Sequence, residues 1–187
     1  MALAKDLSRE KVLDAALSIL REHGLAALSM RRVAAALGAQ PSALYWHVDS
    51  KQDLLAMVAD KILAEASVAP RASSTRQRLR RQALAIRDAL LGVRDAAEVV
   101  SFAQALRPWT STPMRALHDL LAAALPEPAA QRGARTLGHY ILGEVAEEQN
   151  YAELTRAGIV TEAAGIEYSV DVFLFGIDAI LDGLAIN

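Results

Sequence analysis

Apolar residues recur at helical spacing along nearly the whole chain of 187 residues, and this pattern leaves little choice of fold class. Alternating apolar and polar residues bounded by turns, the pattern of a strand, are almost absent. Alanine and leucine, which are both good helix formers, are abundant. The sequence therefore predicts an all-α protein.

Capping and stop residues divide this pattern into separate helices. Ser8 and Ser29 suit the N-caps of the first two helices, and Gly24 and Gly38 suit their ends. Pro41 fits the first turn of the third helix, where a missing N–H costs nothing. The expected helices span about 9–22, 29–36, 40–47, 50–66, 76–91, 95–106, 113–125, 128–152 and 165–184.

A domain boundary is predicted between Val68 and Thr75, a stretch that holds Pro70 and two serines. The first domain, residues 1–67, ends in a linking helix at about 50–66, for which Ser50 and Asp53 form a variant of the capping box. Residues 68–187 form a larger helical domain.

Composition excludes several classes of function. The net charge is −2, and acidic and basic side chains balance over the first 67 residues, so bulk positive charge cannot drive nucleic-acid binding. The chain has no cysteine, which fits a reducing cytoplasm. We expect no signal peptide, because a basic segment followed by an apolar one is missing at the start, and no membrane-spanning segment.

Residues 29–47 have the spacing of a helix-turn-helix, in which two short helices are joined by a tight turn at Gly38. The second helix presents its first turn to the major groove, so Gln40, Ser42 and Ala43 are candidates to read base edges. Further candidates for base or backbone contacts are Arg31, Tyr45, His47 and Lys51. Trp46 is assigned either to the DNA surface or to the small core.

The same segment resembles the TetR family of repressors. Between residues 8 and 65 the chain contains GLAALSMRRVA, LGA and LYWHVDSKQDLL. The resemblance extends to the tetracycline-repressor branch through LLGVRDAAEV (90–99), RP (107–108), LGHYILGEVAEEQ (137–149) and FLFGIDAILDGL (173–184). It implies a ligand-responsive repressor that binds a palindromic, double-stranded operator as a homodimer.

The resemblance also implies roles for individual residues of the DNA-binding domain. It places Arg31, Gln40, Pro41, Ser42, Tyr45, Trp46 and His47 at or beside DNA, and Lys51 at a phosphate. Met30 and Ala43 stand where the tetracycline repressor has threonines that face DNA. The operator sequence is therefore expected to differ.

The ligand pocket departs further from the tetracycline repressor. Val100 stands where a metal-binding histidine is expected, and a valine cannot ligate magnesium. We therefore expect no metal and no cofactor, and a small, largely apolar effector instead of a magnesium–tetracycline chelate. The residues expected at this pocket are Ser67, Gln82, Ile86, Val100, Phe102, His118, His139, Glu147 and Tyr151, with Trp109 and Asn150 as weaker candidates. His118 and His139 are alternatively ordinary core or surface residues.

The last helix is apolar on more than one side, which predicts burial in its own core and against a partner. The homodimer is expected to form through helices at about 128–152 and 165–184, and charged replacements of Phe173 or Ile177 are expected to give monomers. The arginines between Arg71 and Arg94 form either a solvated helix face or a nucleic-acid patch. Phosphate loops and metalloprotease or nucleophile-elbow motifs are absent, so an enzyme is not expected. The alternatives are a constitutive DNA-binding regulator, or a helical small-molecule-binding protein or enzyme whose N-terminal motif is only structural.

Overall fold

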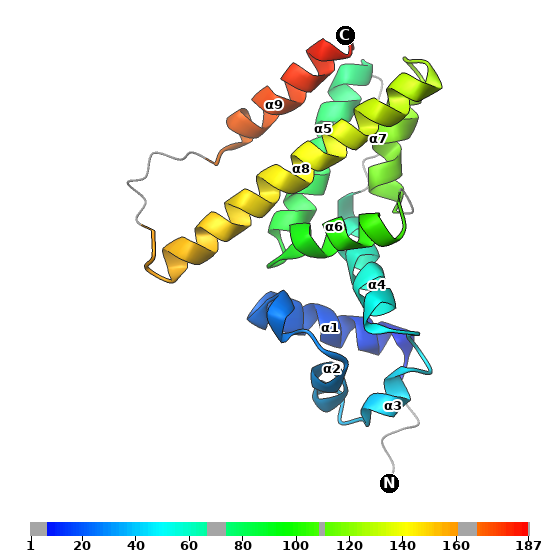
Figure 1. Ribbon diagram of the computed structural model, residues 1–187, viewed down its shortest axis with the longest axis vertical. Coiled ribbons are helices and arrows are strands. Elements are labelled where there is room, and N and C mark those ends of the chain that lie inside the picture. The colour runs from blue at the N-terminus through cyan, green and yellow to red at the C-terminus, as the bar shows by residue number, and fades with distance from the viewer. Residues whose placement is uncertain (1–6, 67–73, 109–110, 161–167, 187) are drawn as a thin grey trace. The chain divides into compact units, whose positions relative to one another are not determined.

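The computed structural model describes residues 7–66, 74–108, 111–160 and 168–186, and the regular structure in these ranges is entirely helical (Figure 1). The helices in chain order are α1 (Arg9–His23), η2 (Leu25–Ala27), α2 (Met30–Ala36), α3 (Pro41–Leu44), α4 (Lys51–Leu63), η3 (Ala64–Ala66), α5 (Thr75–Leu91), α6 (Ala96–Leu106), α7 (Thr112–Ala122), α8 (Glu127–Arg156) and α9 (Val170–Gly183). The all-α prediction is confirmed for the described residues. Among these helices, none is both long enough and apolar enough to cross a membrane.

The helix ends follow local side-chain chemistry. The Ser8 hydroxyl accepts the backbone N–H of Lys11 at 3.2 Å, and the Ser29 hydroxyl accepts that of Arg32 at the same distance. Helix α1 ends at Gly24, whose φ of 76° lies in the left-handed region that glycine adopts without strain. The caps predicted at Ser8, Ser29 and Gly24 are confirmed.

The N-terminus of α4 is capped as the sequence predicts. The backbone N–H of Asp53 donates to the Ser50 hydroxyl at 3.0 Å, and the Asp53 carboxylate accepts the backbone N–H of Asp49 at 3.3 Å. Ser50 thus caps the backbone of Asp53, and the Asp53 carboxylate bonds back to Asp49, the residue before the cap. The helix predicted over 50–66 is observed as α4 followed by the 3-10 turn η3.

The described residues fall into two compact units. The first contains those of Met1–Ile62 together with Val93–Pro108, and the second contains those of Leu63–Gly92 and Trp109–Asn187. Helix α6 therefore belongs to the same unit as the helix-turn-helix, although it follows the predicted boundary in sequence. Residues 67–73 lie outside the described part, so the division at residue 67 stays a prediction.

The first unit is built around apolar faces of α1, α2, α3 and α4. The fully buried side chains there include Val12, Ala16, Leu20, Val33, Ala34, Leu44, Leu54 and Val58. Burial of such side chains supplies about 1.5–3 kcal/mol each for the larger ones, which is the main force that holds the short helices α2 and α3 in place.

In the second unit, α8 and α9 lie side by side and run in opposite directions (Figure 1). A Cβ at Gly133, near the start of α8, would meet Leu184 after the end of α9, and a Cβ at Gly176 of α9 would meet Tyr140 midway along α8. Phe173 stacks on Tyr140 with ring centroids 5.8 Å apart. The small residues at Gly133 and Gly176 therefore allow the close approach of the two helices.

Helix α9 does not use all of its apolar residues in the same way. Phe173, Ile177 and Leu181 are buried in the chain itself, whereas Val172 and Phe175 are exposed. The expectation that Phe173 or Ile177 lies at a dimer interface does not match this burial, because both point into their own core. Residues 165–167 of the predicted helix lie outside the described part.

Candidate DNA-binding site

The turn between α2 and α3 is fixed by backbone hydrogen bonds around Gly38. The N–H of Ala39 donates to the carbonyl of Ala34 at 2.9 Å, and the N–H of Gly38 donates to that of Ala35 at 3.1 Å. This pattern ends a helix with a left-handed residue, and Gly38 has a φ of 62°. Pro41 then begins α3, and Leu44 is its buried anchor. A helix-turn-helix is therefore formed where the sequence predicts it.

The nine residues predicted at DNA all have side chains that are at least partly exposed to solvent. Six are exposed and three are half-buried. The exposed residues are Arg31, Gln40, Ser42, Tyr45, Trp46 and Lys51, and the half-buried ones are Pro41, Ala43 and His47. None of the nine is buried, so each of them has part of its surface exposed to solvent.

The exposure of Trp46 decides whether this residue belongs to the DNA surface or to the small core. Its side chain is 88% exposed, and that of neighbouring Tyr45 is 54% exposed. Two adjacent aromatic side chains in water are unusual and mark an interaction surface. Trp46 therefore does not pack into the small core, and Leu44 and Val48 take that place.

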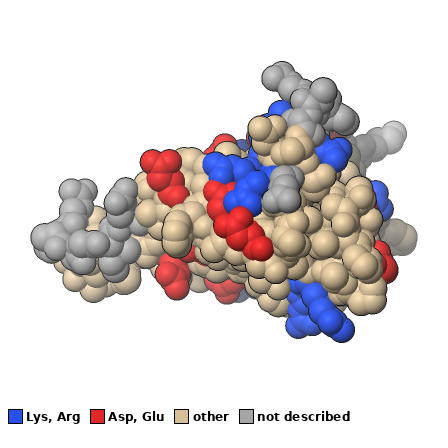
Figure 2. All heavy atoms as spheres, turned by 90° about the horizontal axis from the view of Figure 1, so that it is seen from above, with Lys and Arg blue, Asp and Glu red and all other residues tan. Residues whose placement is uncertain are grey.

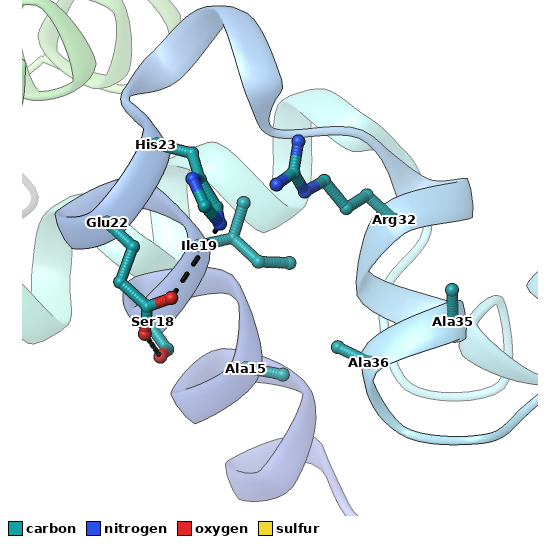
Figure 3. A pocket seen from close by; sticks show the side chains of 8 residues that line it. All are labelled: Ala15, Ser18, Ile19, Glu22, His23, Arg32, Ala35 and Ala36. Atoms are coloured by element: carbon teal, nitrogen blue, oxygen red, sulfur yellow. Dashed lines mark hydrogen bonds and ion pairs between the residues drawn. The ribbon is translucent and has the colours of Figure 1, made fainter.

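An open pocket of about 460 Å³ lies between α1 and α2 on the same unit. Figure 3 shows the Arg32 side chain extending from α2 toward His23 of α1, above an apolar floor that includes Ile19. Glu22 at its rim accepts the hydroxyl of Ser18 at 2.8 Å and lies 3.7 Å from the His23 imidazole. Arg32 is thus an exposed cation next to Arg31 that the sequence reasoning did not single out. Its position in the first turn of a capped helix was the available signal.

The start of α6 is attached to the helix-turn-helix side of the unit. The Asp95 carboxylate accepts the backbone N–H of Leu25 at 2.6 Å. Gly24 lies so close that an added Cβ would be 2.6 Å from the same carboxylate oxygen. Asp95 itself has a φ of 56°, a left-handed conformation in which aspartate is less strained than most residues.

The end of α6 is attached to α4. An Arg107 guanidinium nitrogen donates to the Asp53 carboxylate at 2.6 Å. Residues 93–108 are therefore attached to the DNA-binding unit at both ends of α6. The sequence shows an R-P pair at Arg107 and a capping residue at Asp53, but nothing in it pairs them.

The residues predicted for a ligand pocket are found in different settings. Ile86 and Val100 are fully buried, and the buried Gln82 amide donates to the Ala66 carbonyl at 2.9 Å. Phe102, His139, Glu147 and Asn150 are exposed, and Tyr151 packs on Tyr168. Ser67 and Trp109 lie outside the described residues. Their assignment to one pocket stays a prediction.

His118 has charged partners at the surface. Its imidazole lies 2.8 Å from the Glu127 carboxylate and 3.3 Å from that of Asp119. The hydrogen bond to Glu127, followed by that to Asp119, raises the pKa of His118 above its ordinary value. These contacts account for His118 as a surface residue, and its alternative assignment to the ligand pocket stays a prediction.

The acidic residues of α8 are partly neutralised from within the chain. The buried Arg87 guanidinium donates to Glu148 at 2.8 Å and lies over the Phe173 ring. Burial, followed by the charges of Glu147 and Glu148, raises the pKa of Glu144. Among the described residues, no three acidic or histidine side chains are placed so that they could hold a metal ion.

Two arginines of α5 connect this helix to α9. Arg76 contacts Asp178 at 3.0 Å and Asp182 at 2.6 Å, and Arg80 also pairs with Asp178. On the face drawn in Figure 2, basic side chains likewise lie directly beside acidic ones. Arg76 and Arg80 therefore form ion pairs between α5 and α9. For the other arginines of this stretch, the choice between a solvated face and a nucleic-acid patch stays open.

A helix-turn-helix with exposed side chains on its second helix, carried by an all-helical chain, defines the class of DNA-binding regulators. The family described as bacterial regulatory proteins, tetR family, matches residues 12–58, and the tetracyclin repressor-like C-terminal domain matches residues 69–164. The chain belongs to the TetR family. It is a transcriptional repressor of this family and not an enzyme.

Several relatives resemble the chain over almost its full length. The class D tetracycline repressor protein of Escherichia coli is 31% identical over 197 residues, which cover 97% of this chain and 90% of the relative. BioQ of Mycobacterium smegmatis is 35% identical with a TM-score of 0.85, over 96% of this chain and 98% of its own. A structure of BioQ with its natural double-stranded DNA operator is 34% identical, with a TM-score of 0.82 over 96% and 99% of the two chains. A TetR variant of Acinetobacter baumannii AYE in complex with minocycline is 29% identical, with a TM-score of 0.78 over 96% and 97%.

Proposed function

We propose that this repressor binds a palindromic operator as a homodimer and is released by a small, largely apolar effector that is not a magnesium–tetracycline chelate. The observation that carries the DNA-binding part is the exposure of Tyr45 and Trp46 at the end of α3. The similar BioQ chain has been determined with its operator, which supports the same use of this surface here. Gln40 and Ser42 at the start of α3 are the proposed readers of base edges.

The experiment selects duplexes from randomised DNA with the wild-type chain and measures binding of the selected duplex by gel shift. Arg31→Ala and Tyr45→Phe are expected to weaken binding, because each removes a polar contact to DNA. Arg115→Ala in α7 is the control, since this exposed arginine lies on the second unit and contacts Asp119 of its own helix. Unchanged binding by both motif variants would overturn the assignment of this surface.

Dimerisation is proposed through α8 and α9. The outer side of α9 carries Val172 and Phe175, 40% and 77% exposed, followed by Ala179 one further turn along. Water contact with this row of apolar side chains is unfavourable, and a second copy that presents the same row would cover it. A palindromic operator requires two recognition helices about 34–36 Å apart, and a symmetric dimer supplies two such helices.

The nature of the effector rests on the residues that replace a metal site. Val100 is an apolar, fully buried side chain, and Ile86 is buried to the same degree. Neither supplies a ligand for magnesium. Calorimetry is therefore expected to detect no magnesium-dependent binding of tetracycline, and a measurable magnesium-dependent heat would contradict the proposal.

One observation favours a second candidate, a constitutive regulator without an effector. Ile86 and Val100 are fully buried by the chain's own atoms, and the Gln82 side-chain amide donates to the Ala66 carbonyl. A panel of apolar compounds separates the two candidates. An effector raises the melting temperature and releases operator DNA through linkage, whereas the constitutive regulator responds to none of them.

A further inference from the structure

The pair formed by Arg107 and Asp53 joins two elements that are far apart in sequence. Arg107 follows the last residue of α6, and its backbone N–H donates to the carbonyl of Ala103 at 2.8 Å. Asp53 lies in the first turn of α4. The Arg107 guanidinium reaches the Asp53 carboxylate at 2.6 Å, with the two side chains 47% and 12% exposed. The backbone of the arginine is therefore fixed by its own helix, and its head group is fixed by the carboxylate.

Asp53 in turn organises the segment that follows the recognition helix. One carboxylate oxygen accepts from Arg107, and the other accepts the backbone N–H of Asp49. The backbone N–H of Asp53 bonds to Ser50. The same short segment carries His47 and Lys51, two of the residues proposed at DNA, so Asp53 bonds to the turn that lies between them.

Charge makes Arg107 the natural partner for this site. A carboxylate that is almost fully removed from water needs a positive or hydrogen-bonding partner. The N-terminus of α4 supplies part of this stabilisation, and Arg107 supplies a full charge. Asp60 lies two turns further along α4, where burial raises its pKa and the charge of Arg107 opposes that effect. Arg107 thus serves two carboxylates of the same helix.

We propose that Arg107 is a positioning residue for operator recognition, which holds the turn between α3 and α4 in its binding geometry through Asp53. The inference rests on the proposed DNA contacts of that turn, and it assigns the role to a residue that lies 56 positions beyond Lys51 in sequence and has no proposed contact with DNA. Positioning predicts a loss of specific binding without an equal loss of general attraction to DNA, because phosphate attraction depends on charge and base readout depends on register.

The test compares Arg107→Gln, Asp53→Asn, the double variant and Arg107→Lys. Each is measured against the duplex selected by the wild-type chain and against a scrambled duplex of the same length. Arg107→Gln is expected to weaken binding of the selected duplex about tenfold and that of the scrambled duplex less than about twofold. The double variant is expected to bind the selected duplex no more weakly than the weaker of the two single variants, because both single changes break the same contact. Arg107→Lys keeps the charge and is expected to recover most of the affinity.

Arg115→Gln is the matched control, since its guanidinium is exposed and its ion pair with Asp119 at 3.9 Å stays within α7. Unfolding in urea is followed for every variant, and Arg107→Lys and Asp53→Asn keep the test usable if Arg107→Gln folds poorly. Wild-type affinity for the selected duplex by Arg107→Gln would overturn the inference, as would equal losses on both duplexes or additive single effects. If the wild-type chain itself selects no sequence, the proposed function fails instead.

Discussion

The Asp95 carboxylate accepts the backbone N–H of Leu25 at 2.6 Å, across 70 positions of the chain. Leu25 begins the 3-10 turn η2 that leads from α1 to α2, and its N–H has no partner within a regular helix. The first unit therefore obtains a hydrogen-bond acceptor for a helix-turn-helix element from a segment that is remote in sequence.

Replacement of Asp95 by alanine is expected to lower the free energy of unfolding by about 1–3 kcal/mol. The variant leaves the partly buried N–H of Leu25 without its acceptor and keeps a left-handed backbone that alanine tolerates poorly. Asp95→Asn is the control, because asparagine retains an oxygen acceptor and tolerates this conformation. Urea unfolding measures both. Equal stability of Asp95→Ala and the wild type would contradict the role of the bond.

Gly24, at the end of α1, and Gly38, at the end of α2, form a matched pair that separates backbone strain from close packing. Both have positive φ angles, 76° and 62°, so alanine is strained at either position by about 1 kcal/mol or more. An added Cβ at Gly24 also meets Asp95 at 2.6 Å, whereas at Gly38 nothing lies within 4 Å. Gly24→Ala is therefore expected to lower the free energy of unfolding in urea clearly more than Gly38→Ala does. The reverse order would contradict a cost of the contact with Asp95.

Stability should depend on pH through His118. Its pKa is raised above the usual 6.5, first by the hydrogen bond to Glu127. Because the folded pKa exceeds the unfolded one, the stabilisation is fully present below pH 6.5 and is lost as the pH rises through the folded pKa. Glu127→Gln is expected to reduce this loss in urea unfolding between pH 6 and 8.5. Glu153→Gln is the control, since Glu153 pairs with Arg156 instead. If Glu127→Gln left the pH dependence of the free energy of unfolding unchanged, the stabilising role of the His118–Glu127 hydrogen bond would be contradicted.

Phe173 and Phe175 separate folding from association. Phe175→Glu is expected to give folded monomers in sedimentation, because its side chain is 77% exposed and belongs to the proposed dimer surface. Phe173→Glu is expected to cost more than about 4 kcal/mol of stability, because that ring is buried between Tyr140 and Arg87. A Phe175→Glu variant that remained dimeric would exclude this face of α9.

Local chemistry made part of this structure predictable. Ser29, Gly38 and the Ser50–Asp53 pair determine where helices begin and end, and these signals lie within a few residues of their effect. The helix-turn-helix followed from them, and so did the exposed face of α3. Trp46 remained open because an aromatic side chain suits either a core or a DNA surface, and only the observed packing of Leu44 and Val48 decides it.

Contacts between distant segments were not predictable. Nothing local marks Asp95 as the partner of Leu25, or Arg107 as the partner of Asp53. On α9, apolar residues surround the helix, so periodicity cannot say that Phe173 faces the core and Phe175 faces water. Arg76 and Arg80 of α5 show the same limit, because their acidic partners Asp178 and Asp182 lie about a hundred positions away.

The central claim is that two copies of the helix-turn-helix read one palindromic site. The most direct test titrates three duplexes: the selected one, one with a single half-site scrambled, and one fully scrambled. It measures the affinity and the mass of each complex at physiological salt. We expect two chains on the intact palindrome, bound at least about a thousandfold more tightly than a fully scrambled duplex. The half-scrambled duplex should lose most of this advantage. One chain per duplex, or equal affinity for all three duplexes, would contradict the account.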